Sequence, residues 1–289
     1  MVSVGAVIAG AFRLFREQRI AVLIWALVAI AISAIFTLWY LPGWRDRYLA
    51  GSATSASMLG WIIPFYLFAL VVMLLQTSAA FRAVMRPDEG AAGFLRLGMD
   101  ELRLLGLGLL WLILNLVLYM LLAVAAGATI GAMFGAMGNP RPAVYLLLPI
   151  VLLPIYGAMI YLHVRLSPAI ALTLLRRRIV IGEAWRLTRG QFWRLLGAYL
   201  AVGLMQLAGY ALVWSISMGP YLGGLARGGS FATVAIARAQ MGFGPLMVIS
   251  VLLGAAFNVC LYATWAGTVG TATLELLGKQ GADYATTFE

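Results

Sequence analysis

The sequence predicts an all-α membrane protein: a polytopic helical bundle with about six transmembrane helices and amphipathic helices at the cytoplasmic interface. Three observations predict it. Of the 289 residues, 63% are hydrophobic and only 10% are charged, whereas soluble proteins carry about 25% charged residues. Six apolar runs are long enough to cross a bilayer, and the basic residues are unevenly shared between the two sides of these runs. We therefore expect one integral membrane domain spanning residues 1–289.

The apolar runs set the number of spans. A helix needs roughly 20 apolar residues to cross about 30 Å of hydrocarbon, where it satisfies its own backbone hydrogen bonds. Six segments meet this length: residues 20–40, 58–81, 104–134, 143–165, 194–217 and 244–276. We also expect an amphipathic arm over residues 3–19 and interfacial segments over residues 91–103 and 176–193.

The basic residues predict the orientation of the chain. The N-terminal arm, the loops after the second and fourth spans and the C-terminal tail together carry 15 of the 20 lysines and arginines. Cytoplasmic loops carry such an excess, so both termini are expected in the cytoplasm. All basic residues except Lys279 are arginine, a bias typical of GC-rich bacterial genomes. The expected location is therefore the bacterial cytoplasmic (inner) membrane.

The stretch "RRRIVIGEAWRLTRGQFWRLLG" (176–197) combines arginines with aromatic rings. Such rings suit the headgroup layer, and arginines beside them pair with lipid phosphates. Either one helix continues through this stretch, or Gly190 ends a short surface helix before the fifth span. An interfacial anchor is favoured over a specific anionic-ligand clamp, and nucleic acid is excluded because a soluble scaffold is lacking. The candidate headgroup and interface residues are Arg165, Arg176, Arg177, Arg178, Trp185, Arg186, Arg189, Trp193 and Arg194.

Few polar side chains lie within the spans. The four amides there are Gln76, Asn115, Gln206 and Asn258. Amides in lipid normally form hydrogen bonds between helices, so structural cross-linking is favoured over lining a cavity. In the third span, Gly127, Gly131 and Gly135 recur every fourth residue and predict close helix packing, with homodimerisation as the alternative.

The sequence offers little catalytic chemistry. Metal sites need clustered histidine, cysteine or carboxylate ligands, and the chain has one histidine, one cysteine and ten scattered acids. It contains neither a G-x-S-x-G nucleophile motif nor a phosphate-binding loop. We therefore expect no catalytic residues, no metal and no cofactor. A lipid-modifying enzyme is the least favoured of the functions considered.

Two stretches carry a family resemblance. "RLSPAIAL" (165–172) and "GEAWRLTRGQFWRLLG" (182–197) resemble the bacterial glycerophosphoryl diester phosphodiesterase membrane-domain family. In that family the membrane domain is sometimes fused to a soluble phosphodiesterase barrel. The present sequence holds no such barrel, so no phosphodiesterase residues carry over. The resemblance implies a standalone multi-pass membrane module with a lipid-related context.

These observations favour a protein that binds or helps move an amphipathic, lipid-like or peptide-like molecule. Its expected partners are anionic membrane lipids. The alternative is a non-transporting scaffold or regulatory subunit that docks a protein partner through its basic cytoplasmic arms. Either a protein partner or a second copy of the chain is compatible with the sequence.

Overall fold

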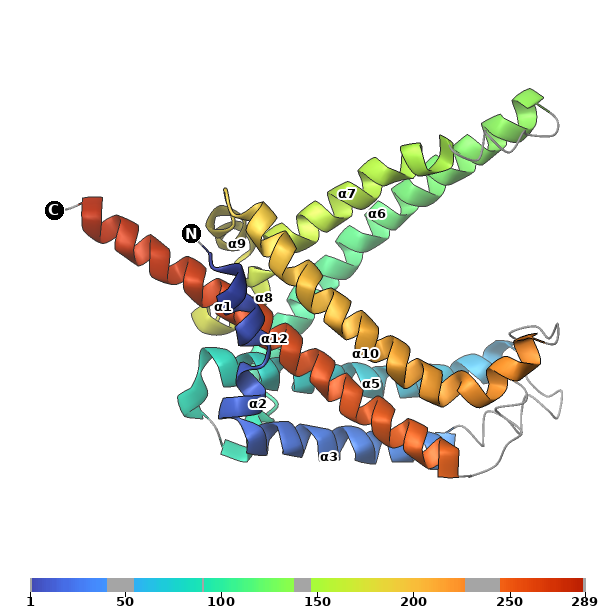
Figure 1. The fold of residues 1–289 in the computed structure, drawn as a ribbon, viewed down its shortest axis with the longest axis horizontal. Coiled ribbons are helices and arrows are strands. Elements are labelled where there is room, and N and C mark those ends of the chain that lie inside the picture. The colour runs from blue at the N-terminus through green and yellow to red at the C-terminus, as the bar shows by residue number, and fades with distance from the viewer. Residues whose placement is uncertain (1, 41–54, 90, 138–146, 227–244, 288–289) are drawn as a thin grey trace. The chain divides into compact units, whose positions relative to one another are not determined.

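The apolar runs of the sequence form long helices. A computed structural model describes residues 2–40, 55–89, 91–137, 147–226 and 245–287. Within these ranges every element of regular secondary structure is a helix, and six helices are long and apolar enough to cross a membrane (Figure 1). The all-α fold class and the six spans predicted from the sequence are therefore confirmed.

The long apolar stretches lie close to their predicted positions. They cover Arg19–Leu38, Ile63–Met85, Met99–Gly131, Leu152–Arg176, Phe192–Ile216 and Val248–Gly278. Residues 143–146 and 244, which the sequence assigns to two spans, lie outside the described residues. The five arginines of the less basic side also lie outside them: Arg45, Arg47, Arg141, Arg227 and Arg238.

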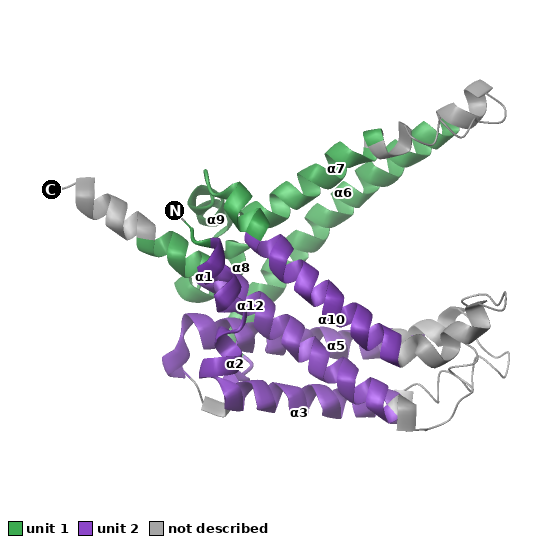
Figure 2. Cartoon of the chain, viewed as in Figure 1, with its two compact units in different colours: residues 1–3, 98–197, 272–289 green, residues 4–97, 198–271 purple. Residues whose placement is uncertain are grey.

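The chain folds into two compact units (Figure 2). Unit 1 comprises Met1–Ser3, Gly98–Gly197 and Ala272–Glu289, and unit 2 comprises Val4–Leu97 and Ala198–Thr271. The third and fourth spans thus belong to unit 1. Unit 2 combines the first two spans with most of the last two, which follow in the chain about 100 residues later.

Unit 2 is built from short N-terminal helices and four long ones. Its elements are α1 (Val4–Ala11), α2 (Arg13–Glu17), α3 (Arg19–Ile35), the π-helical turn η1 (Phe36–Tyr40), α5 (Ser55–Met85), the 3-10 turns η2 (Pro87–Glu89) and η3 (Ala91–Phe94), and most of α10 (Phe192–Ala226) and α12 (Pro245–Thr287). Ring contacts join α10 to α12, with Tyr199 and Trp265 centred 5.7 Å apart. The predicted amphipathic arm consists of two short helices, α1 and α2, which are separated at Phe12.

Unit 1 is dominated by two neighbouring helices, α6 (Met99–Met137) and α7 (Leu147–Leu166), which run side by side (Figure 1). The shorter helices α8 (Pro168–Arg176) and α9 (Ile181–Leu187) follow. Helix α6 exposes many large apolar side chains, including Leu112 (62%) and Val124 (68%). A long helix with such a wide exposed apolar surface is typical of a membrane span.

Each of the two predicted interfacial segments, residues 91–103 and 176–193, leads directly into a long apolar helix. Helix α6 begins at Met99 and continues directly into the third span, so residues 91–103 do not form a separate helix. The cause is local, because the Glu101 carboxylate accepts the Gly98 N–H (2.8 Å) and caps the new helix. Residues 176–193 contain the last residue of α8, the short helix α9 and the first two residues of α10, and Gly190, just before α10, adopts a left-handed φ of 76°. The structure thus has the arrangement in which Gly190 precedes the fifth span.

The glycines that allow close packing are not the predicted ones. A Cβ atom at Gly127 or Gly131 would meet open space among the described residues, so no described helix packs closely against them. Gly135 lies in α6, but its surroundings are outside the description. In unit 2, by contrast, a Cβ at Gly267 would collide with the backbone carbonyl of Gly10. Helices α1 and α12 therefore approach each other through glycine.

Candidate functional site

A cavity of about 720 Å³ lies within unit 2, between α3, α5 and α12. Ligand pockets typically measure about 300–1,000 Å³ and are mostly apolar with a few polar groups. This cavity fits that description. Its lining residues are Ala29, Ile32, Ser33, Ile63, Tyr66, Leu67, Ala69, Leu70, Val72, Met73, Gln76, Gly254, Ala255, Asn258 and Tyr262.

Small residues create the space. Ala29 on α3 and Gly254 and Ala255 on α12 present little side-chain volume to the cavity. A Cβ added at Gly254 would meet open space. Helix α5 contributes larger side chains that remain accessible, with Tyr66 66% and Leu67 58% exposed. The cavity can therefore be reached from outside the unit. Its lining residues belong to stretches of α3, α5 and α12 that are long and apolar enough to cross a membrane.

One buried amide stands out on the cavity wall. Gln76 is only 4% exposed, and its Nε2 has no hydrogen-bond partner among the described residues. A buried donor left unsatisfied costs about 1–3 kcal/mol. Asn258 and Tyr262, one helical turn apart on α12, line the same cavity. The cavity wall thus contains a buried N–H donor that has no partner among the described residues.

The four amides predicted from the sequence take three different roles. Gln76 and Asn258, which are 182 positions apart in the chain, come together on the cavity wall. Gln206 Nε2 donates to Thr264 Oγ1 (2.7 Å) and so joins α10 to α12. Asn115 Nδ2 donates to the Trp111 carbonyl within its own helix (2.7 Å).

Sequence reasoning missed several cavity residues. Tyr66, Tyr262, Ser33 and Gly254 line the cavity but carry no distinguishing motif. Tyrosine, serine and glycine are common in membrane helices, and only the packing of α3, α5 and α12 gives these four a shared surface. The amides alone were visible, because an amide in an apolar run is unusual.

The candidate headgroup residues lie in unit 1, and Arg165 differs from the rest. Arg165, near the end of α7, is only 5% exposed. Its guanidinium carbon lies 4.3 Å from the ring centroid of Trp185 and 5.8 Å from that of Tyr161. Cation–π contacts are worth about 2 kcal/mol when they are desolvated. Arg165 is therefore a packed residue of unit 1 rather than a loop charge.

The other headgroup candidates are more accessible. Arg176 pairs with Glu183 (3.0 Å), so part of its charge is already neutralised. Arg177 has a left-handed φ of 53° where α8 ends. Trp193 is 79% exposed at the start of α10. The remaining members are exposed or half-buried: Arg178, Arg186, Arg189 and Arg194.

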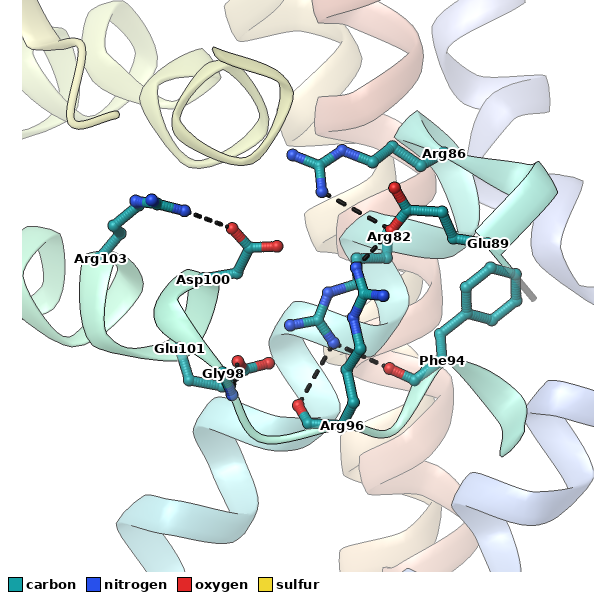
Figure 3. A network of polar contacts seen from close by, with 9 residues as sticks. All are labelled: Arg82, Arg86, Glu89, Phe94, Arg96, Gly98, Asp100, Glu101 and Arg103. Carbon is teal, nitrogen blue, oxygen red and sulfur yellow. Dashed lines mark hydrogen bonds and ion pairs between the residues drawn. The ribbon is translucent and has the colours of Figure 1, made fainter. Parts of the chain in front are cut away.

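A polar cluster around Arg82 lies at the C-terminal end of α5 in unit 2 (Figure 3). Arg82 is 1% exposed and donates through Nη1 to the carbonyl oxygen of Phe94 (2.9 Å). Trp25 Nε1 donates to the neighbouring carbonyl of Gly93 (2.7 Å). Glu89 forms ion pairs with Arg86 (3.7 Å) and with Arg96. From the sequence Arg82 counts as a loop charge, but here it fastens the η3 turn to α5.

The remaining reactive side chains are isolated from one another. Across the described residues, no group of three or more histidine, cysteine, aspartate or glutamate side chains could hold a metal ion. The His163 ring stacks on Trp111 with centroids 4.5 Å apart. Its Nδ1 lies 2.7 Å from the Met159 carbonyl oxygen. His163 thus has a local structural environment in unit 1.

Comparisons of the chain with protein-family models, with curated proteins and with solved structures find no match. Membership of the glycerophosphoryl diester phosphodiesterase membrane-domain family stays a prediction from residues 165–172 and 182–197.

Proposed function

We propose that this protein binds an amphipathic, lipid-like molecule in the cavity of unit 2 and helps to hold or move it within the membrane. The apolar wall formed by α3, α5 and α12 would take the hydrocarbon part of the ligand. A lipid-like ligand is favoured over a peptide because the wall is almost entirely aliphatic and aromatic. The sequence resemblance to a family with a lipid-related context points the same way.

The observation that carries this proposal is the amide of Gln76. A buried N–H donor without a partner is costly in an apolar environment, more so at membrane depth. An ester or amide carbonyl of a ligand would satisfy Nε2 and recover that cost. A lipid carries such carbonyls where its chains join the headgroup, so one ligand can supply both the acceptor and the apolar surface. No catalytic step is part of the proposal.

The cavity can be filled without disturbing its walls. Gly254→Leu would place a side chain into open space at the cavity. Gly203→Leu is the matched control, because Gly203 lies in α10 of the same unit, a Cβ there also meets open space, and it does not line the cavity. Both changes replace a helical glycine by a better helix former, so both variants are expected to fold.

Native mass spectrometry of the gently purified protein would measure the retained ligand. We expect wild type and Gly203→Leu to retain a discrete lipid, and Gly254→Leu to lose it by about tenfold, which corresponds to roughly 1.4 kcal/mol of binding free energy. Equal retention in all three proteins, or only a statistical spread of bulk lipid, would contradict binding in the cavity. That result would favour the alternative, a scaffold that docks a protein partner through its basic arms.

We also propose that the protein resides in the bacterial cytoplasmic membrane with both termini in the cytoplasm. The support is the uneven distribution of basic residues, because 15 of the 20 belong to the N-terminal arm, two loops and the C-terminal tail. Single cysteines introduced at Arg16 and Arg178, in a Cys260→Ala background, should react with an impermeant maleimide only after the cells are opened. Labelling of either position in intact cells would contradict the proposed orientation.

A further inference from the structure

Arg165 lies in unit 1 and is not part of the cavity of unit 2. Its side chain is 95% buried, and its Nε is enclosed without a hydrogen-bond partner. Among the described residues the guanidinium forms neither a hydrogen bond nor an ion pair. Its contacts are with the faces of Trp185 and Tyr161. A buried charge is normally paired, because removing it from water is costly.

Four acids of unit 1, those whose side chains the structure describes, are engaged elsewhere. The carboxylate of Asp100 pairs with Arg103 (2.8 Å), and that of Glu183 pairs with Arg176 (3.0 Å). Glu101 accepts the N–H of Gly98, and Glu275 accepts the N–H of Ser3 (2.8 Å each). The described part of this unit therefore contains no carboxylate that serves Arg165. Its positive charge is left for a ligand.

The surroundings hold the guanidinium in place. Thr188 donates from Oγ1 to the carbonyl oxygen of Arg165 (3.1 Å) and so fastens the end of α9 to the end of α7. Trp185 on α9 stacks on the guanidinium, and Tyr161 contacts the rings of both Trp185 and Phe192. Because Nε is enclosed, the edge left for a ligand is the one formed by the two Nη groups. Two N–H groups on one edge match two oxygens of a phosphate group.

From this geometry we infer that Arg165 is the core of a phosphate-binding site, with Trp185 as the platform that orients the guanidinium. The ligand is a phosphate group, carried either by an anionic membrane lipid or by a soluble molecule. The wider basic segment would then attract anions without discrimination, while Arg165 alone provides a fixed geometry.

The test compares two arginines of the same unit. Arg165→Gln removes the buried guanidinium, and Arg178→Gln removes one positive charge from an exposed side chain. Delipidated protein in a maltoside detergent would be titrated with phosphatidic acid, and binding followed by native mass spectrometry. Diacylglycerol, which has the same chains without phosphate, is the ligand control. Inorganic phosphate would be added as a competitor to separate a lipid source from a soluble one.

We expect Arg165→Gln to weaken the binding of phosphatidic acid by about tenfold, and Arg178→Gln to leave it within about twofold. Diacylglycerol should bind wild type and Arg165→Gln equally. Competition by millimolar inorganic phosphate would indicate a soluble phosphate ligand, and its failure to compete would indicate a lipid phosphate. Equal losses in the two arginine variants would overturn the site, because they would show only general charge attraction.

A folding control keeps the test decisive. The thermal melting of Arg165→Gln should resemble that of wild type, because glutamine keeps part of the aliphatic stem. If this variant does not fold, Arg165→Lys takes its place, since lysine keeps the charge but lacks the planar fork. Wild-type affinity for phosphatidic acid in Arg165→Lys would contradict the proposal, and a loss of severalfold would support it.

Discussion

Gln76 and Gln206 carry the same amide, yet their surroundings give them different roles. Gln206 Nε2 is satisfied by Thr264 across the interface of α10 and α12. Gln76 Nε2 is buried at the cavity and has no partner in the described part of the chain. Replacing an amide by an apolar side chain should therefore have opposite consequences at the two positions.

Gln76→Leu tests the role of the open donor. We expect the ligand-free protein to become more stable, by about 1–3 kcal/mol, because a buried unsatisfied group is removed. We expect ligand retention to fall at the same time, because the acceptor of the ligand loses its partner. Thermal melting of delipidated protein and native mass spectrometry measure the two effects.

Gln206→Leu is the control for this pair. It should cost stability, by about 0.6 kcal/mol for one interhelical hydrogen bond, and leave ligand retention unchanged. If the two leucine variants shift stability and ligand retention in the same direction, Gln76 and Gln206 do not have the different roles described above.

The burial of individual arginines could not be predicted from the sequence. Arg82 and Arg165 fall in basic segments, and by composition alone they resemble their exposed neighbours. Both are at least 95% buried, because Arg82 binds the carbonyls of the η3 turn and Arg165 stacks on Trp185. These contacts join residues 12 and 20 positions apart. No local pattern specifies them.

At the scale of elements, glycine decides how closely α1 and α12 approach. Gly10 lies against Gly267 and Thr271, so that any side chain at either glycine would overlap its neighbour. Stacked small residues allow such an approach in membrane helices. From the sequence, close packing was predicted for the third span instead, because three glycines are evenly spaced there. Periodicity indicates a small-residue face but does not show whether a helix packs there.

Gly267→Ala tests this approach. The new methyl group would meet the backbone of Gly10, which cannot rotate away as a side chain can. We expect a loss of about 1–3 kcal/mol, as for overpacked cores. Gly203→Ala is the control, since its methyl group meets open space and alanine favours helix by up to about 1 kcal/mol. Equal melting temperatures for the two variants would argue against a close contact between α1 and α12.

The number and approximate positions of the spans follow from the sequence, whereas the exact ends of the helices do not. Six apolar runs of sufficient length leave helix as the only structure that satisfies the backbone in lipid. The boundaries depend on single contacts, such as the Glu101 cap at the start of α6 and the left-handed Gly190 before α10. The Gly190 break was one of two arrangements compatible with the sequence, because a continuous helix would also place Trp185, Thr188, Phe192 and Leu196 on one face.

For the whole molecule, span order does not reveal which spans pack together. Unit 2 unites helices from both ends of the chain, and its cavity depends on that union, because α3 and α5 come early in the chain and α12 is the last helix. Hydropathy finds each span separately and carries no information about their pairing. The cavity is the basis of the proposed function, and it arises only when these helices pack together. Of its lining residues, the sequence singled out only the amides Gln76 and Asn258.

Photocrosslinking with a lipid that carries a diazirine in its acyl chain would show whether a lipid binds in the cavity between α3, α5 and α12. After irradiation of membranes that contain the wild-type protein, peptide mapping locates the modified residues. The account predicts adducts concentrated in residues 63–76 and 254–262, and their loss in Gly254→Leu. Adducts spread over the exposed apolar surfaces of α6 and α10 as densely as over the cavity, and unchanged by Gly254→Leu, would contradict it.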